Sequence, residues 1–187
     1  MTELVFFHEE PSAKAMLEGL IPRLLDNPRV QVRYIVFEGK QDLEKRLPLR
    51  LRAWQNPEAR FLVMRDQDSG DCKEIKAKLL SICHSAGRPD AVVRIACHEL
   101  ESFYLGDLNA VAKAIGPSRL SGQQNNAKYR NPDRLNNASQ ELKRLAQSYQ
   151  KISGSCAIGQ TLSLEGNRSH SFNQLLDGIR KLTGAVE

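Results

Sequence analysis

Short apolar runs alternate with amphipathic segments over residues 4–115, and this alternation limits the possible folds more than any other feature. The runs at residues 4–7, 30–37, 60–65 and 91–97 are apolar and mostly β-branched or aromatic, which predicts four strands. The segments that follow them, at residues 13–25, 41–54, 72–86 and 99–115, carry apolar residues at helical spacing. We expect Pro48 to break the second of these helices. Repeated strand–helix units predict a parallel sheet of about four strands in a three-layer α/β/α fold.

The rest of the chain is predicted to be a helical extension. A polar loop at residues 116–132 precedes helices at 133–149 and 171–183, with an irregular stretch up to residue 165 between them. We therefore expect an α/β domain at residues 1–115 and a C-terminal extension at 116–187, packed together as one globular unit.

The charge is distributed unevenly between the two parts. Residues 1–107 hold 16 basic and 17 acidic residues, a net charge of −1, whereas residues 108–187 hold 11 and 5, a net charge of +6. A basic surface beside an acidic pocket suits an enzyme with a polyanionic substrate. The alternative is a basic surface that only contacts solvent.

Several classes of protein are disfavoured by the sequence. No stretch approaches the roughly 20 apolar residues of a membrane span, and the N-terminus looks like a first strand rather than a signal peptide. The four cysteines form no CxxC pair and lack zinc-site spacing, so we expect reduced thiols. We expect a cytoplasmic protein without membrane contact.

Acidic residues follow three of the predicted strands. Glu9 comes after the first, Asp66 and Asp68 after the third, and Glu99 after the fourth. Parallel strands bring their carboxyl ends to one edge of the sheet, so we expect these side chains to converge there. Carboxylate oxygens are hard ligands that suit Mg²⁺ or Mn²⁺. The alternative for the Asp-x-Asp pair is an ordinary turn at a helix start.

Neighbouring residues have structural interpretations. Glu10 and Asp71 lie where helices should begin, which suits helix capping. Glu101 is the alternative to Glu99 as the further acid. His98 is expected to be structural, with a metal ligand or proton carrier as the alternative.

Basic residues of the extension are candidates for phosphate binding. Arg168 and Ser169 lie at the start of the last helix, where backbone N–H groups and a guanidinium can hold a phosphate. Lys128 and Arg130 lie in the preceding loop and are candidates for contact with nucleic acid. The alternative is that Ser171 caps the helix while Arg168 forms a salt bridge.

Four runs in the same order resemble the bacterial domain-of-unknown-function family 4276. They are FHEEPS at 7–12, VMRDQDSGDC at 63–72, RIACHELESFYLGD at 94–107 and NRSHSF at 167–172. That family is similar to Toprim domains, the metal-binding fold of topoisomerases, primases and overcoming-lysogenization-defect nucleases. The resemblance implies a Toprim-like, Rossmann-like fold in which Glu9, Asp66 and Asp68 bind metal and catalyse, with a further acid at Glu99 or Glu101.

The same resemblance implies a function. We expect a Mg²⁺- or Mn²⁺-dependent nuclease (a hydrolase) or another phosphoryl-transfer enzyme acting on nucleic acid. Relatives often look like partners of ATPases in phage-defence or toxin-like gene pairs. Two departures from the Toprim pattern, Glu10 in place of a glycine and Ala13 in place of a second acid, favour the alternative of a non-catalytic module that assembles with an ATPase. A flavodoxin-like small-molecule enzyme is less expected, because no glycine-rich loop follows the first strand.

Overall fold

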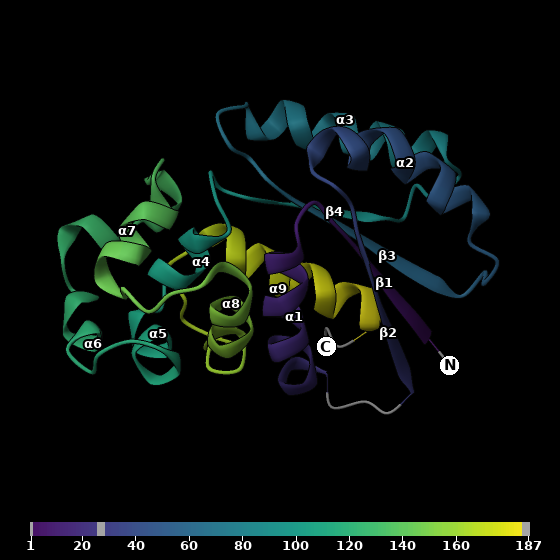
Figure 1. Ribbon diagram of the computed structural model, residues 1–187. Helices are drawn as coiled ribbons and strands as arrows, with labels where there is room; N and C mark the ends of the chain where they lie inside the picture. The colour runs from purple at the N-terminus through teal and green to yellow at the C-terminus, as the bar shows by residue number, and fades with distance from the viewer. Residues whose placement is uncertain (1, 26–28, 185–187) are drawn as a thin grey trace.

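The computed structural model describes residues 2–25 and 29–184, so the parts of the predicted ranges at 1, 26–28 and 185–187 lie outside it. Within the described residues one parallel sheet has the strand order β2-β1-β3-β4. The strands are β1 (Thr2–His8), β2 (Val30–Val36), β3 (Ala59–Asp66) and β4 (Val92–Ala96). Helices cover both faces of this sheet (Figure 1), which confirms the predicted three-layer α/β/α fold.

Two helices cover one face of the sheet. They are α2 (Lys40–Ala53) and α3 (Cys72–Ser85), which pack against each other and against the sheet. Successive side chains of a strand point to opposite faces. Val5 and Phe7 of β1 therefore join the apolar cluster beneath α2 and α3, while Leu4 and Phe6 join the cluster on the other face.

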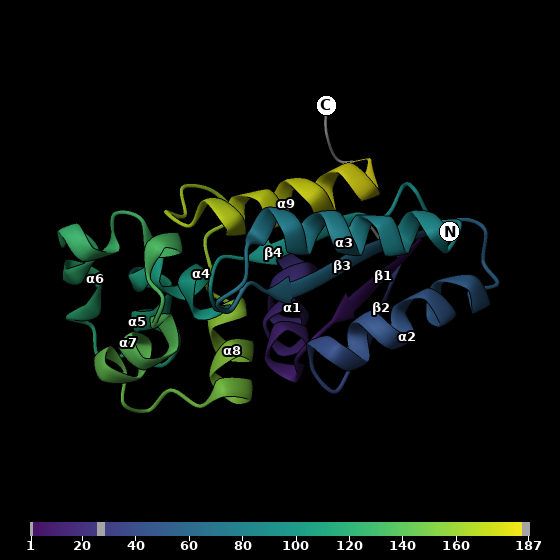
Figure 2. The ribbon, with the colours of Figure 1, turned by 90° about the horizontal axis from the view of Figure 1, so that it is seen from above.

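The opposite face is covered by α1 (Pro11–Leu24) and α9 (His170–Thr183), and α8 (Lys151–Gly159) packs against α1. The remaining elements form a lobe at one end of the sheet (Figures 1 and 2). They are α4 (Glu101–Leu105), α5 (Leu108–Ala114), α6 (Leu120–Gln123), η1 (Ala127–Tyr129), η2 (Pro132–Arg134) and α7 (Ala138–Leu145).

The first apolar cluster joins the two predicted ranges. Leu175 and Ile179 of α9 belong to the same cluster as Leu62 and Met64 of β3, and α9 contacts β1, β3 and β4. The C-terminal helix therefore completes one face of the sheet, so both ranges share a core.

The predicted break at Pro48 is wrong, because α2 runs continuously through it. Leu43, Leu47 and Leu51 recur every four residues and are fully buried. A proline inside a helix removes one backbone hydrogen bond and distorts the turn before it. Here the buried leucine stripe offsets that cost, and the helix continues to Ala53.

The predicted irregular stretch after residue 150 is also wrong in its first half, where α8 forms. Its sequence is rich in glycine and serine, which have lower helix propensity than alanine. Packing against α1 provides the compensation, since Gly159 lies directly against the Met16 backbone. The predicted helix at residues 133–149 is divided in the structure into η2 and α7.

Across the described residues, no helix combines the length and apolar character that crossing a membrane requires.

Candidate metal and phosphate site

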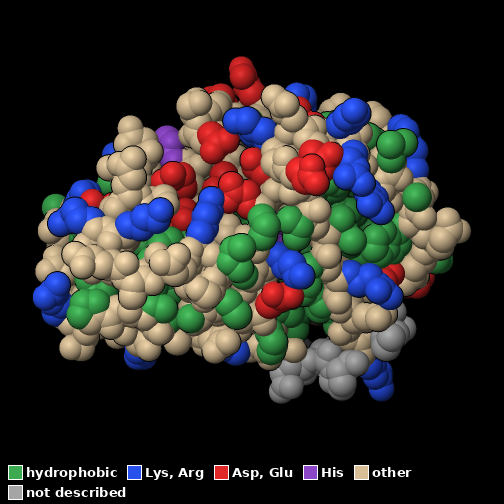
Figure 3. All heavy atoms as spheres, in the orientation of Figure 1, with side chains coloured by type: hydrophobic (Ala, Val, Ile, Leu, Met, Phe, Trp, Pro, Cys, Tyr) green, Lys and Arg blue, Asp and Glu red, His purple; other side chains and the backbone are tan. Residues whose placement is uncertain are grey.

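The carboxyl ends of β1 and β3 bring two predicted site residues to one edge of the sheet. β1 ends at His8, and the next residue, Glu9, continues the ladder through its N–H to the Met64 carbonyl at 3.4 Å. β3 ends on Asp66 itself. Figure 3 shows that Asp and Glu side chains gather on this part of the surface, with Lys and Arg side chains around them.

Glu9 is a buried carboxylate whose charge is only partly offset by its neighbours. Its side chain lies 3.7 Å from the Arg65 guanidinium, measured from Oε2 to Nε, and the residue is only 8% exposed. Within the described chain, Oε2 has no hydrogen-bond partner. Burial raises the pKa of Glu9, while Arg65 lowers it and the charges of Asp68 and Glu10 raise it again.

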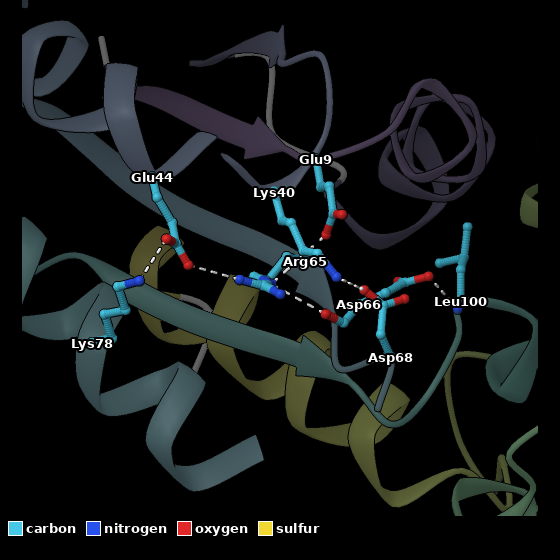
Figure 4. Close-up of polar contacts among 8 residues, drawn as sticks. All are labelled: Glu9, Lys40, Glu44, Arg65, Asp66, Asp68, Lys78 and Leu100. Atoms are coloured by element: carbon cyan, nitrogen blue, oxygen red, sulfur yellow. Dashed lines mark hydrogen bonds and ion pairs between the residues drawn. The ribbon is translucent and has the colours of Figure 1, made fainter. Parts of the chain in front are cut away.

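Asp66 lies among several other carboxylates. Its Oδ2 accepts a hydrogen bond from the Leu100 N–H at 3.1 Å (Figure 4). Burial raises the pKa of Asp66 well above its ordinary value, and the nearby charges of Glu101, Glu10 and Glu9 raise it further. Burial and neighbouring negative charge therefore both favour the protonated form of Asp66.

Asp68 lies on a strained turn. Both Asp68 (φ 54°) and His98 (φ 58°) have left-handed backbones, which are uncommon for residues other than glycine. The Asp68 N–H donates to the His98 carbonyl at 2.8 Å, and His98 Nδ1 lies 3.2 Å from the Asp68 carbonyl oxygen. Two adjacent loops thus hold each other in place. The Asp68 carboxylate forms an ion pair with Lys40 at 3.0 Å.

The two predicted caps are used differently. The Asp71 carboxylate accepts hydrogen bonds from Lys73 N and Glu74 N at the start of α3, so its capping role is confirmed. Glu10 precedes α1 but makes no capping hydrogen bond with its side chain. Its carboxylate instead forms an ion pair with Lys151 at 2.5 Å.

Glu99 and Glu101 lie in different surroundings. Glu99 Oε2 accepts a hydrogen bond at 2.8 Å from Ser139 N in the first turn of α7. Glu101 is 1% exposed and accepts a hydrogen bond from the Tyr149 hydroxyl at 2.9 Å. Of the two, Glu101 is the one whose charge contributes to the raised pKa of Asp66.

The start of α9 already contains an anion from the chain itself. The Asp133 carboxylate accepts hydrogen bonds from Ser169 Oγ at 2.6 Å and from Ser171 N at 2.7 Å. Ser169 is the N-cap and is fully buried. Arg168 donates to the Gln124 carbonyl. Asp133 thus uses the donors that a phosphate would need there.

The two predicted basic contacts in the preceding loop also differ. Lys128 Nζ lies 2.7 Å from Glu141, which Arg144 contacts as well. Arg130 is exposed and lines a shallow hollow with Arg168 and Asn125. Arg130 therefore remains accessible to a ligand, whereas the exposed Lys128 already has a carboxylate partner within the chain.

The donor chemistry of this edge fits a divalent cation. Among residues 2–25 and 29–184, no three His, Cys, Asp or Glu side chains converge as a ready metal cage. Glu9 Oε2 nevertheless has no hydrogen-bond partner among the described residues, and the pKa of Asp66 is raised, so a cation would stabilise both carboxylates. Glu9, Asp66 and Asp68 are the residues that would hold Mg²⁺ or Mn²⁺, whereas Glu99 is engaged by α7.

The structure places two basic side chains at this site, Arg65 and Lys40, that the sequence analysis did not name as site residues. Arg65 lies between the apolar run at residues 61–64 and Asp66 and is buried, with its Nη1 3.0 Å from Glu44. A charged residue in an apolar run is the signal that would have identified it. Lys40 begins α2 just after β2, at the same edge of the sheet as the carboxylates. The rule that selected Glu9 also applies to Lys40.

Comparison with known proteins yields one match. A family model described as "Domain of unknown function (DUF4276)" matches residues 8–180. Searches of curated proteins and of solved structures found nothing similar. The matched region includes Glu9, both aspartates of the Asp-x-Asp pair and the start of α9. The chain therefore belongs to the family of domains of unknown function known as DUF4276.

Proposed function

We propose that this protein is a Mg²⁺- or Mn²⁺-dependent nuclease, or another phosphoryl-transfer enzyme, that acts on nucleic acid. The observation that carries the proposal is the position of two carboxylates, the buried Glu9 and the half-buried Asp66, at the carboxyl ends of adjacent parallel strands. Among the described residues, Glu9 Oε2 has no hydrogen-bond partner. Ligand sites of open α/β sheets lie at this edge. The resemblance to Toprim domains supports the same assignment.

The residues suit distinct roles in such a reaction. Asp66 and Asp68 would hold the cation, which supplies stabilisation of negative charge on the phosphoryl oxygens. Glu9 has a raised pKa and an oxygen without a hydrogen-bond partner among the described residues, so it suits proton transfer to or from the nucleophile or leaving group. Arg130 and the hollow beside it offer a contact for the phosphate backbone.

The cellular setting is part of the proposal. The four free cysteines favour a cytoplasmic protein. The family resemblance favours one that works with an ATPase in a phage-defence or toxin-like system. A basic C-terminal region, with a net charge of +6 over residues 108–187, supports contact with nucleic acid.

A second candidate function is a non-catalytic module that binds an ATPase partner. The observation that favours it is the internal pairing of the acids. Asp68 pairs with Lys40, Glu99 with the start of α7, and Glu10 with Lys151. A module that needs no cation would keep its acidic residues paired in this way.

Nuclease activity separates the two candidates. Supercoiled plasmid and single-stranded RNA are incubated with the protein and Mg²⁺ or Mn²⁺, alone and with the ATPase encoded next to its gene, if one is present. We expect metal-dependent cleavage that Asp66→Ala abolishes and that the exposed control Glu58→Gln leaves unchanged. Absence of cleavage under all of these conditions, together with binding of the protein to the ATPase, would support the module instead.

A further inference from the structure

Lys40 lies between the acidic site and a neighbouring pocket. Its Nζ is 3.0 Å from Asp68 Oδ2, and the two side chains are 49% and 41% exposed. The same lysine lines a pocket of about 410 Å³ between α2 and α3, hereafter the α2–α3 pocket. One side chain therefore borders both a candidate cation ligand and a cavity.

The other cations of the α2–α3 pocket have carboxylate partners outside the Asp-x-Asp pair. Glu44 contacts Arg65 at 3.0 Å and Lys78 at 2.6 Å (Figure 4). Arg65 is buried and lies near Glu9 as well. Lys40 differs from Lys78 because its partner, Asp68, is a residue that would bind the divalent cation, and it differs from Arg65 because its side chain is exposed rather than buried.

A hydrogen bond holds the backbone next to Lys40 in place, whereas the Lys40 side chain is exposed to solvent. Gly39 has φ 96°, a conformation that favours glycine, and its N–H donates to the Glu9 carbonyl at 3.3 Å. The start of α2 is thereby tied to the end of β1. A lysine carries its charge on a flexible four-carbon stem, so the ammonium can change partner without movement of the helix.

We propose that Lys40 is an exchangeable counter-ion. Its ammonium neutralises Asp68 while no divalent cation is bound, and it turns into the α2–α3 pocket when a cation takes its place. There, beside Arg65 and Lys78, it binds a phosphate group of the nucleic-acid substrate. This inference rests on the proposed function, because it requires Asp68 to bind a cation. Cation binding and phosphate binding then strengthen each other.

Mn²⁺ titration calorimetry tests the first half of the exchange. Lys40→Met removes the competitor for Asp68, so the Mn²⁺ Kd should fall about two- to fivefold, the range expected from losing an exposed ion pair. Lys78→Met is the matched control. It removes the same charge from the same pocket, but its partner is Glu44. Its Mn²⁺ Kd should equal that of the wild type.

Binding of the 5′-phosphorylated dinucleotide pTpT tests the second half. Mn²⁺ should strengthen pTpT binding in the wild type and should do so much less in Lys40→Met. Without metal, Asp68→Asn should release Lys40 and strengthen pTpT binding. In a Lys40→Met background, Asp68→Asn should give no such gain, so the double variant Lys40→Met/Asp68→Asn should bind pTpT no more strongly than Lys40→Met alone. Lys45→Met, at an exposed position of the same helix, controls for loss of a positive charge.

The outcomes separate this inference from the proposed function. Equal Mn²⁺ affinity of the wild type, Lys40→Met and Lys78→Met would overturn the exchange and leave the metal site intact. A gain from Asp68→Asn that persists without Lys40 would overturn it too. Mn²⁺ binding by Lys40→Met but not by the wild type would support it. No Mn²⁺ binding by either protein would overturn both proposals.

Discussion

At the scale of single residues, the Asp66 carboxylate destabilises the folded protein at neutral pH. Burial and the neighbouring charges of Glu101, Glu10 and Glu9 raise its pKa above the unfolded value, which is about 3.9. The folded state then holds the proton more tightly than the unfolded state. The cost of this carboxylate is therefore absent at low pH and grows as the pH rises above about 4.

Asp66→Asn should consequently stabilise the protein while removing its proposed activity. The amide oxygen can still accept the Leu100 N–H hydrogen bond, and the buried charge is lost. We expect the free energy of unfolding at pH 7 to rise by about 0.5–2 kcal/mol. Urea denaturation measured from pH 4 to pH 8 checks this, and the gain should increase with pH.

The exposed Asp90 provides the control for this variant. Asp90→Asn should change the free energy of unfolding by less than about 0.5 kcal/mol at every pH, because Asp90 lies at the surface with an Arg60 contact of 3.5 Å. A less stable Asp66→Asn protein at pH 7, or a gain that does not vary with pH, would show that the charge of Asp66 is compensated after all.

At the scale of elements, the crossing of α1 and α8 depends on two glycines. A Cβ built at Gly159 would lie 2.1 Å from the Met16 carbonyl oxygen, and one at Gly19 would lie 2.6 Å from the Cys156 carbonyl oxygen. Both contacts are with backbone atoms, which cannot rotate away. The two helices approach closely because neither glycine has a side chain at the crossing point.

Gly159→Ala should therefore destabilise the protein by about 1–3 kcal/mol, even though alanine favours helices. Gly122→Ala is the matched control, because it lies in the short helix α6 and its Cβ would meet no atom within 4 Å. It should leave the free energy of unfolding unchanged or raise it by up to about 1 kcal/mol. Thermal denaturation of both variants is the measurement, and equal melting temperatures would contradict the glycine crossing.

Local pattern predicted the elements of the sheet and failed where tertiary contacts decide. The strands could be predicted within one or two residues, since Val63 and its neighbours form apolar runs that only a buried strand accommodates. The helix α8 could not be predicted from local pattern, because a glycine such as Gly159 favours this helix only when α1 packs closely against it. Pro48 was misleading for the same reason. The leucines that keep α2 helical past this proline do so by packing against the sheet, which the local sequence does not show.

At the scale of the whole molecule, the site too could be predicted only in part, because tertiary contacts determine the partners of its acids. Strand ends predicted that Glu9 and Asp66 reach one edge, because topology alone determines this. The partners of the acids depend on elements that are distant in sequence. Lys40 lies 28 residues from Asp68, and Glu99 lies 40 residues from Ser139. No spacing rule connects such pairs, so the sequence could identify the residues at the strand ends but not which partner each acid takes.

The C-terminal range supplies part of the cover of one face of the sheet, beside α1. In α9, Phe172, Leu175, Leu176 and Ile179 are buried in the cluster that includes Leu62 of β3. Figure 2 shows α9 running alongside β4. Without residues 116–187, the part of this face that α9 covers and the α8 side of α1 would be exposed to water. Burial of such apolar surface is the main favourable term in folding.

A chain truncated after Ile115 should therefore fail to fold cooperatively, although it contains every strand of the described sheet and every candidate metal ligand. We expect no sigmoidal thermal transition by circular dichroism and strong binding of the dye ANS, which reports exposed apolar surface. Adding the fragment 116–187 in trans should restore a cooperative transition. If residues 1–115 instead melt cooperatively alone and bind Mn²⁺, the C-terminal range is an accessory to an independent metal-binding domain.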